Sequence, residues 1–282
     1  MATKKTTTEL PEEDLKLQTS TTTVCLIGTT PFIGNRMAEK GLHDILFPPP
    51  KKNASERASS LKHNPVQEYR SSPYVLRNPK SPSYIAHLPS AFKGAIKNVA
   101  LDMPGSTKAQ IGRLVSVDGE YVPMFGGPKM LMSVVRSADM NHTPDVRTRC
   151  ILPEWCCEIS VTIAKPLLSE RKVLGLLAAA GVIQGTGDWR PGKGNGTFGR
   201  FRLCNPDDPE FLRIKAEGGR EAQRAALLAE RPECYDDQTE ELFSWFLEEL
   251  VRRDRVPTAA EMAAEAEELD VIGSGEMVEF EE

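Results

Sequence analysis

A glycine-rich stretch between a predicted helix and a predicted strand constrains this fold most. Residues 181–203 read GVIQGTGDWRPGKGNGTFGRFRL, and six glycines follow Gly181. Ser169 is suited to the N-cap of a helix that runs to about Ala180, where Gly181 would end it. A short strand is expected from residue 197 to 203. The chain therefore leaves a helix, crosses a loop of unusual backbone freedom, and enters a strand.

This loop contains most of a phosphate-binding P-loop, but its neighbours are in the reverse order. Gly187 and the pair Gly192-Lys193 have the required spacing, whereas Gly194 occupies the position of the magnesium-binding Ser or Thr. A P-loop also runs from a strand into a helix, so that the helix N-terminus faces the phosphates. Nucleotide hydrolysis is thus disfavoured, although backbone amides in such a loop remain suited to gripping phosphate oxygens.

The order of predicted elements indicates an α+β domain. Strands are expected at residues 21–30, 129–136 and 154–163, and amphipathic helices at 89–100 and 169–180. Together with the strand at 197–203, this is the βαββαβ order of a ferredoxin-like domain, modified by a long insertion after the first strand and by extra strands in the middle. The domain is expected to span residues 21–203.

Two local patterns inside this domain make specific predictions. Pro89 and Ser90 are expected to open the first long helix, with Ser90 as its N-cap. Its buried stripe is predicted to comprise Phe92, Ala95, Ile96, Val99 and Ala100. Further on, Asp118-Gly119 lies between two extended runs and predicts a two-residue hairpin.

Three segments are expected to lie outside the packed domain. Residues 47–83 hold seven prolines and seven Lys or Arg residues, which predicts a basic insertion with no packed element. Residues 1–20 are polar and predicted to be disordered. Residues 204–270 are predicted to be a helical extension, and residues 271–282 an acidic tail.

Two patterns mark the helical extension. One apolar helix face is predicted to comprise Leu242, Phe243, Phe246, Leu247, Leu250 and Val251. Thr258 and Glu261 have the spacing of a capping box.

Charge is distributed unevenly along the 282 residues, whose net charge is −5. Residues 21–203 hold 24 basic and 13 acidic side chains, whereas residues 204–282 hold 8 and 23. A basic body attached to an acidic end favours a body that binds a polyanion. Ordinary surface solvation is the simpler alternative.

Composition argues against several other classes of protein. The six cysteines form no C-x-x-C pair and the four histidines are scattered, so neither a metal site nor another cofactor is expected. The cysteines are expected to be small buried hydrophobic residues of a reducing compartment. No leader sequence or membrane span is evident, and we expect a cytoplasmic protein of a bacterial cell, encoded by the bacterium or by a phage.

The candidate binding residues gather around the glycine-rich loop and the first long helix. Phosphate contacts are expected from the basic residues Lys93, Lys97, Arg190, Lys193, Arg200 and Arg202. Trp189 and Phe198 offer aromatic faces on which bases can stack. The alternative for both rings is an ordinary place in the core. Lys93 and Lys97 share one helix face, and Phe198, Arg200 and Arg202 share one face of the predicted strand.

Three stretches resemble the RAMP superfamily of CRISPR-associated proteins. LPSAFKGAIK at 88–97 looks like the helix start of subunits that coat guide RNA. The loop itself is placed like the RAMP glycine-rich loop, after the second helix and before the last strand. LIGTTPFIGNRMAEK at 26–40 and the region 153–201 are similar to phage-encoded relatives of unknown role. The resemblance covers about residues 22–203 and implies a ferredoxin-like fold that coats RNA.

The leading hypothesis is a non-catalytic subunit that coats single-stranded nucleic acid, with RNA favoured over DNA, as a homo-oligomer along the strand. Neither the cleaving aspartate of RAMP nucleases nor a histidine placed as a processing base can be matched here. One alternative is a phage structural, assembly or interaction protein that keeps the fold without nucleic acid. The other is a nuclease, for which Asp44 and Asp188 are the acidic residues to check. The acidic tail is expected to rest on the basic surface or to dock a protein through Met277, Val278 and Phe280.

Overall fold

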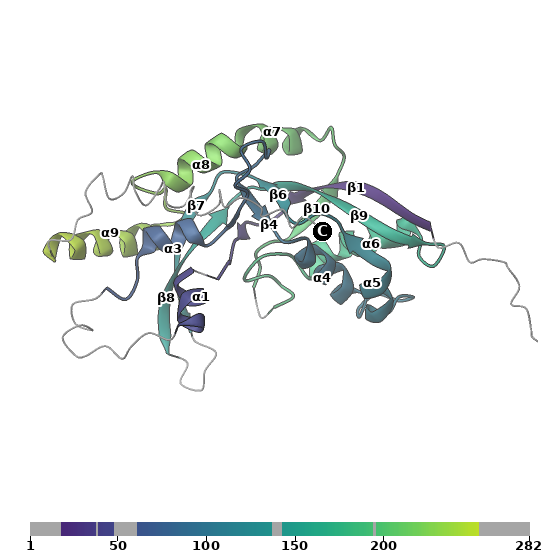
Figure 1. The fold of residues 1–282 in the computed structure, drawn as a ribbon, viewed down its shortest axis with the longest axis horizontal. Helices are drawn as coiled ribbons and strands as arrows, with labels where there is room; N and C mark the ends of the chain where they lie inside the picture. Colours follow the sequence, from purple (N-terminus) through teal and green to yellow (C-terminus); the bar gives the residue numbers. More distant parts are fainter. Residues whose placement is uncertain (1–17, 38, 48–60, 137–142, 194–195, 254–282) are drawn as a thin grey trace, which may run out of the picture.

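A computed structural model describes residues 18–37, 39–47, 61–136, 143–193 and 196–253. Within them the chain forms a mixed α/β structure with two antiparallel sheets (Figure 1). The larger sheet and the helices beneath it occupy one side of the view, and the smaller sheet occupies the other. The glycine-rich loop lies at the joint between the two sheets, as the contacts below establish.

The larger sheet is built around two long central strands. Strand β1 (Gln18–Gly28) pairs with β9 (Cys156–Lys165) along ten residue pairs, from Gln18↔Lys165 to Ile27↔Cys156. The strand order is β10-β1-β9-β6-β4-β3, and β5 also pairs with β9. The remaining strands are β3 (Tyr74–Val75), β4 (Ile85–His87), β5 (Val115–Val117), β6 (Val122–Phe125) and β10 (Phe201–Cys204).

The Asp118-Gly119 turn does not form the predicted hairpin. Strands β5 and β6 both run antiparallel to β9, at Val115↔Ile163 and Phe125↔Cys156. The two strands therefore follow one another along the same edge of β9 instead of pairing together. Gly119 has a φ of 94°, a backbone conformation that favours glycine. Its turn separates two strands that lie end to end along β9, not two strands that pair with each other. The hairpin prediction was wrong because β9 is long enough to accept both strands.

Three helices cover one face of this sheet: α4 (Pro89–Val99), α5 (Lys108–Leu114) and α6 (Glu170–Ile183). The predicted stripe of α4 is buried in the main core together with Trp155 and the inward residues of β9, such as Ile159. Ser169 is the N-cap of α6, as predicted. Ser90 is not a cap, because the helix begins one residue earlier at Pro89 and Leu88 takes the N-cap position.

The opposite face of the sheet is covered at one end by α7 (Pro209–Glu217), with α8 (Arg220–Leu228) following it (Figure 1). A second cluster of buried residues forms there, comprising Cys25, Ile27, Phe125, Cys156, Phe211 and Ile214. Strand β9 is thus buried on both faces where α7 crosses it. All six cysteines are free, and four of them are buried.

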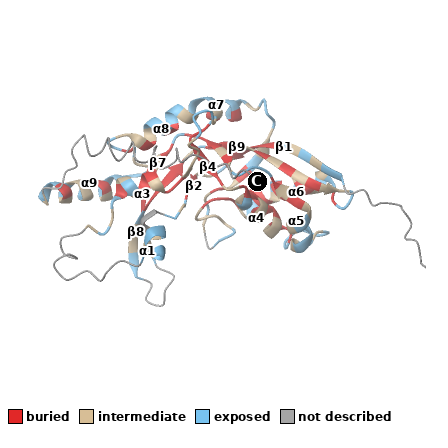
Figure 2. Cartoon of the chain, in the orientation of Figure 1, coloured by how far each residue is buried: buried red, intermediate tan, exposed pale blue. Residues whose placement is uncertain are grey.

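The smaller sheet has the order β2-β8-β7. Its strands are β2 (Phe32–Ile33), β7 (Lys129–Arg136) and β8 (Pro144–Leu152). Helix α9 (Asp237–Arg252) packs through Phe243 and Leu250, which are both buried. Helix α1 (Glu39–Leu46) lies near β8 (Figure 2). Val251 was predicted on the apolar face but is 68% exposed, because its neighbour Leu250 takes the inward position in the last turn of the helix.

Part of the predicted insertion is packed, which corrects the expectation for residues 47–83. Helix α3 (Pro65–Ser71) fully buries Tyr69 and nearly buries Arg70. The Arg70 guanidinium donates to the carbonyls of Leu227 and Ala229, at 3.1 and 3.2 Å. Prolines did not prevent packing because Pro65 opens the helix at its first turn, where no amide donor is needed.

Several other predictions concern residues outside the described ranges. These include residues 1–17 of the N-terminus, the capping box at Thr258 and Glu261, and the tail at 271–282. The N-terminus was predicted to be disordered through residue 20, but residues 18–20 form the start of β1 and pair with β9. Among the helices described here, no helix combines the length and the apolar character needed to cross a membrane.

Gly181 provides a test of how the helices pack on the sheet. Helix α6 continues past it to Ile183, so it does not end the helix as predicted. A Cβ at Gly181 would lie 2.1 Å from the carbonyl oxygen of Phe201. We expect Gly181→Ala to lower the free energy of unfolding by about 3 kcal/mol, because a sheet carbonyl cannot move aside.

Gly175 in the same helix is the matched control. Nothing lies within 4 Å of a Cβ added there. Gly175→Ala should therefore raise stability by about 1 kcal/mol through helix propensity alone. Urea denaturation of both variants measures the difference, and equal effects at the two positions would refute the close contact of α6 with β10.

Candidate nucleic-acid interface

Backbone hydrogen bonds close the base of the glycine-rich loop and join it to the segment that links β1 of the larger sheet to β2 of the smaller sheet. The Thr186 amide donates to the Gly199 carbonyl at 2.9 Å, and the Gly199 amide donates to the Pro31 carbonyl at 2.7 Å. Gly199 has a φ of 69°, and a Cβ there would lie 1.7 Å from the Thr186 carbonyl oxygen. The two ends of the loop can approach this closely only with glycine at that position.

The smaller sheet holds the next part of the loop. The Asp188 amide donates to the Ile33 carbonyl at 3.0 Å, and the Phe198 amide donates to the Trp189 carbonyl at 3.1 Å. Trp189 and Phe198 pack against the buried residues Ile33, Leu131 and Ile151. Their ring centroids are 6.1 Å apart. The core alternative thus accounts for one side of each ring, and both side chains are only half-buried, which leaves part of each ring exposed to solvent.

A buried ion pair underlies the Trp189 ring. Arg149 on β8 lies 3.1 Å from Asp188, with side chains only 6% and 12% exposed, and Asn35 donates to the same carboxylate at 3.2 Å. The Arg149 guanidinium lies 5.4 Å from the Trp189 ring centroid. Burial lowers the pKa of Arg149, although the Asp188 carboxylate acts in the opposite direction. Asp188 therefore holds the loop, and it is not an exposed acid of the kind a nuclease needs.

Sequence reasoning missed Arg149. Its signal was weak, because a buried arginine in a strand looks like any arginine at the edge of a sheet. The useful pattern would have been the i, i+2 spacing of Arg147 and Arg149, which places both on one face of β8, where Arg147 is exposed and Arg149 is buried. In the structure Arg149 contributes positive charge directly beneath an aromatic ring of the loop.

A neutral histidine joins the loop to the start of α4. The Nε2 atom of His87 lies 2.8 Å from the Thr186 hydroxyl, and its ring meets Phe92 at 5.7 Å between centroids. Complete burial, with a smaller contribution from Arg190, lowers the pKa of His87 to about 3. The imidazole is therefore uncharged at neutral pH, and the first turn of α4 is held beside the loop.

Helix α4 presents a positive end at this point. Its N-cap Leu88 supplies no side-chain hydrogen bond, and its first turn contains no acidic residue. Lys93 and Lys97 are both half-exposed, and the alkyl chain of Lys97 lies against Gly112 of α5. A helix N-terminus carries partial positive charge, to which the Lys93 ammonium adds.

The basic residues of the loop are in different environments. Arg190 turns back and donates to the Gly187 carbonyl at 2.6 Å, whereas Lys193 is exposed. Arg200 is half-buried, and its backbone amide donates to the Thr30 hydroxyl at 2.9 Å. The Nε atom of Arg200 is buried without a hydrogen-bond partner within the described residues. These three residues share the loop with Trp189 and Phe198.

Arg202 does not join this group. It makes ion pairs with Asp208 at 3.0 Å and Glu210 at 2.8 Å, at the N-terminal end of α7. These hydrogen bonds raise the pKa of Arg202. Strand β10 begins only at Phe201, and Cys204, two residues beyond Arg202, packs against the α7 cluster. Arg202 therefore points to the α7 side of the sheet, where two carboxylates already neutralise it.

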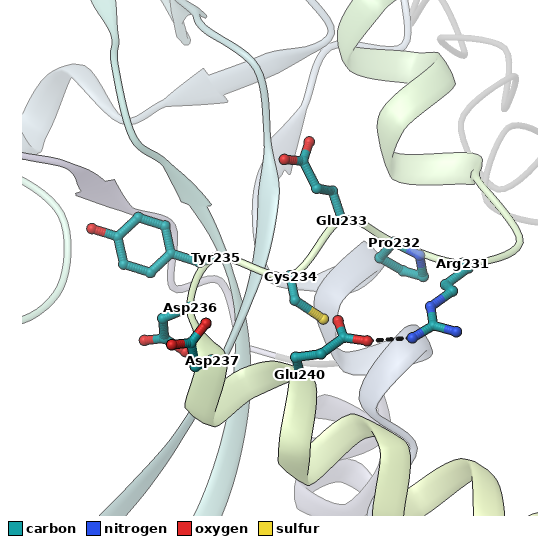
Figure 3. A pocket seen from close by; sticks show the side chains of 8 residues that line it. All are labelled: Arg231, Pro232, Glu233, Cys234, Tyr235, Asp236, Asp237 and Glu240. Carbon is teal, nitrogen blue, oxygen red and sulfur yellow. Dashed lines mark hydrogen bonds and ion pairs between the residues drawn. The ribbon is translucent and has the colours of Figure 1, made fainter.

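A surface pocket near α9 has the wrong charge for a polyanion (Figure 3). It is lined by Arg231, Pro232, Glu233, Cys234, Tyr235, Asp236, Asp237 and Glu240. Glu240 pairs with Arg231 and Glu233 pairs with Lys129, which leaves the carboxylates of Asp236 and Asp237 on the rim. Burial, with the hydrogen bond to Glu240, raises the pKa of Cys234 to about 12, so its thiol stays protonated. In the part of the chain that the structure describes, no group of side chains is arranged to hold a metal ion.

Comparison with known proteins adds little to this geometry. No protein-family model and no curated protein matches the sequence. Among solved structures, the chain is similar to the crystal structure of Cmr6 from Pyrococcus furiosus, with 10% sequence identity and a TM-score of 0.36. The match covers 67% of this chain and 100% of that one. A TM-score this low carries no functional inference, so the interface is argued from its own residues.

His87 makes the interface sensitive to acid. Its pKa is lower in the folded chain than the usual 6.5, so below that pH the unfolded chain takes up a proton that the folded chain does not. Stability should therefore fall as the pH drops from 6.5 towards 3, by ~2 kcal/mol at pH 5 from this group.

Urea denaturation across this pH range compares the native chain with His87→Gln. In the His87→Gln variant the free energy of unfolding should no longer fall with pH by the amount that His87 contributes. The His43→Gln variant, changed at an exposed position, should keep that contribution. An unchanged slope in His87→Gln would show that His87 is not buried in its neutral form.

Proposed function

We propose that the chain is a RAMP-like subunit that binds single-stranded nucleic acid, with RNA favoured over DNA, and that it catalyses no reaction. The observation that carries this proposal is the glycine-rich loop fixed beside the N-terminus of α4. The loop carries the half-exposed rings of Trp189 and Phe198 and the cations of Lys193 and Arg200, and Lys93 lies on the adjoining helix α4. Aromatic faces next to positive charge are the combination that single strands require.

The topology supports the ferredoxin-like part of the proposal. The order β10-β1-β9-β5, antiparallel throughout, has its two crossover helices α4 and α6 on one face. A βαββαβ chain produces this order when each helix returns across the same face of the sheet. The extra strands β3, β4 and β6 extend the sheet beyond this unit.

Electrostatics support a polyanionic ligand on the loop side. Residues 21–203 carry a formal charge of 24 − 13 = +11. The carboxylates at the α7 end pair with Arg202, Arg213 and Lys215, so the basic residues of that side are already neutralised. Phosphates are therefore attracted to the loop and to α4 in preference to the α7 side.

The two rival functions are less well supported. A nuclease needs an acid exposed beside the bound strand, whereas Asp188 is paired with Arg149, and Asp44 lies on α1 next to His43. A purely structural role leaves unexplained why a loop with two half-exposed rings also carries the basic residues Arg190, Lys193 and Arg200. The sequence preference of the interface is left open, since phosphate contacts and stacking are tolerant of sequence.

Salt dependence tests the proposed interface directly. Affinity for a labelled single-stranded RNA should fall steeply with salt, because bound phosphates release counterions. The triple change Lys93→Gln, Lys193→Gln and Arg200→Gln should reduce the slope of log K against log salt by about 2, at roughly 0.7 per lost contact. Fluorescence anisotropy over a salt series measures both quantities.

Two paired cations are the matched controls. Arg202→Gln and Lys215→Gln together remove two positive charges from the α7 side, against three in the loop variant, and Lys215 lies 2.8 Å from Glu158 there. Both should leave the salt slope nearly unchanged. An equal decrease of the salt slope in the controls and in the loop variant would mean that only the net charge matters. That result would contradict a localised interface.

The acidic tail is proposed to compete for the same surface. Residues 271–282 lie outside the described residues and hold four glutamates and no basic residue. A tethered segment acts at an effective concentration near millimolar, so weak contacts are enough to compete. Deleting 271–282 should tighten RNA binding and raise the association rate at low salt in stopped-flow experiments. Unchanged kinetics would leave the tail only a role towards other proteins.

A further inference from the structure

Among the described residues, strand β1 has one unpaired edge over its first seven residues. It pairs with β9 from Gln18 to Ile27, but β10 covers its other edge only from Cys25 to Gly28. Within the described residues, no strand pairs with the stretch Gln18–Val24 on the β10 side. In Figure 1 this half of β1 forms the outer border of the larger sheet.

The direction of each backbone group along this edge follows from two hydrogen bonds. The Gly28 amide donates to Trp155 on the β9 side at 2.8 Å, and the Thr29 amide donates to Arg200 on the β10 side at 2.8 Å. Successive residues of an antiparallel strand alternate between its two edges. The β1–β9 register runs without a bulge. Thr19, Thr21 and Thr23 therefore direct their amides and carbonyls towards the free edge.

This edge lacks the usual protection against strand pairing. Natural edge strands carry lysines, prolines or bulges, or they are covered. The sequence from Gln18 to Ile27, QTSTTTVCLI, contains no charge and no proline. The side chains of Thr19, Thr21 and Thr23 are all exposed. They lie on the same face of β1 as Cys25 and Ile27, but α7 covers only the part of this face near Cys25 and Ile27.

The edge is complementary to itself. If a second copy pairs antiparallel about a two-fold axis at Thr21, then Thr21 faces Thr21, and Thr19 faces Thr23. All outward-pointing backbone groups of these three threonines then find partners in the other copy. Every pair on that face is threonine with threonine, which is a favourable cross-strand pair, and no like charges meet.

We propose that two copies of this chain associate through the β1 edges, which makes one continuous sheet across the two-fold axis. The interaction is independent of the proposed nucleic-acid site, because the loop and α4 lie away from this edge. A single strand pair buries less surface than a permanent dimer, so the association should be reversible and concentration-dependent.

Position 21 provides the sharpest test, because it faces itself across the axis. Thr21→Lys alone and Thr21→Glu alone should each be more monomeric than the native chain at equal concentration, since like charges meet. An equimolar mixture of the two variants should recover the dimer. Sedimentation velocity over a concentration series measures the fraction of dimer in each sample.

Backbone substitution provides a second test. Thr21→Pro removes an amide that points away from β9, so the internal ladder stays intact. It removes the two central bonds of the dimer and should weaken association about thirtyfold. Thr21→Val keeps the amide and the branched side chain, and should still dimerise.

Hydrogen exchange of the native chain should show amides 19, 21 and 23 becoming protected as the concentration rises. Amides 20 and 22, bonded to β9, should be protected throughout. A native chain that stays monomeric at every concentration overturns the proposal, as does a Thr21→Pro variant that dimerises like the native chain. Protection of amides 19, 21 and 23 in the monomer also overturns it, since another segment then covers the edge. Failure of the Lys and Glu mixture to recover the dimer excludes the register centred on Thr21.

Discussion

The close attachment of the glycine-rich loop to both sheets is the constraint on which the rest of the structure depends. Gly199 brings the two ends of the loop together at Thr186, and Asp188 ties the same loop to Ile33 of the smaller sheet. The ion pair of Asp188 with Arg149 reinforces that second attachment. Losing either partner of this buried pair leaves an uncompensated charge, which typically costs about 3–5 kcal/mol. The loop is thus a structural joint as well as the candidate binding surface.

These two roles are compatible because they use different atoms. Backbone amides, His87 and the buried sides of Trp189 and Phe198 hold the loop in place. The half-exposed rings and the Lys193 ammonium remain for a ligand. A surface held in place before binding loses little conformational entropy when a flexible strand is bound.

Much of the larger sheet could be predicted from the sequence, because periodicity reports burial directly. The alternation along β9 and the apolar stripe of α4 both correspond to buried faces in the structure. The arrangement around Asp118-Gly119 could not be predicted correctly, because the residues of a turn do not show which strand the two flanking segments pair with. Here both segments pair with β9. Tyr69 and Arg70 were missed because a basic, proline-rich composition concealed a short helix. The sequence predicted the basic side chains of the candidate site except Arg149, and the pairing of Arg202 with α7 depends on tertiary contacts.

The central claim is that single strands contact the glycine-rich loop and the start of α4. Ultraviolet cross-linking to an RNA that contains 4-thiouridine, followed by mass spectrometry of the peptides, tests it most directly. Cross-links should concentrate in residues 184–200 and 87–97, with Trp189 and Phe198 as the main attachment points. Cross-links confined to the α7 side, or spread evenly over the surface, would contradict it.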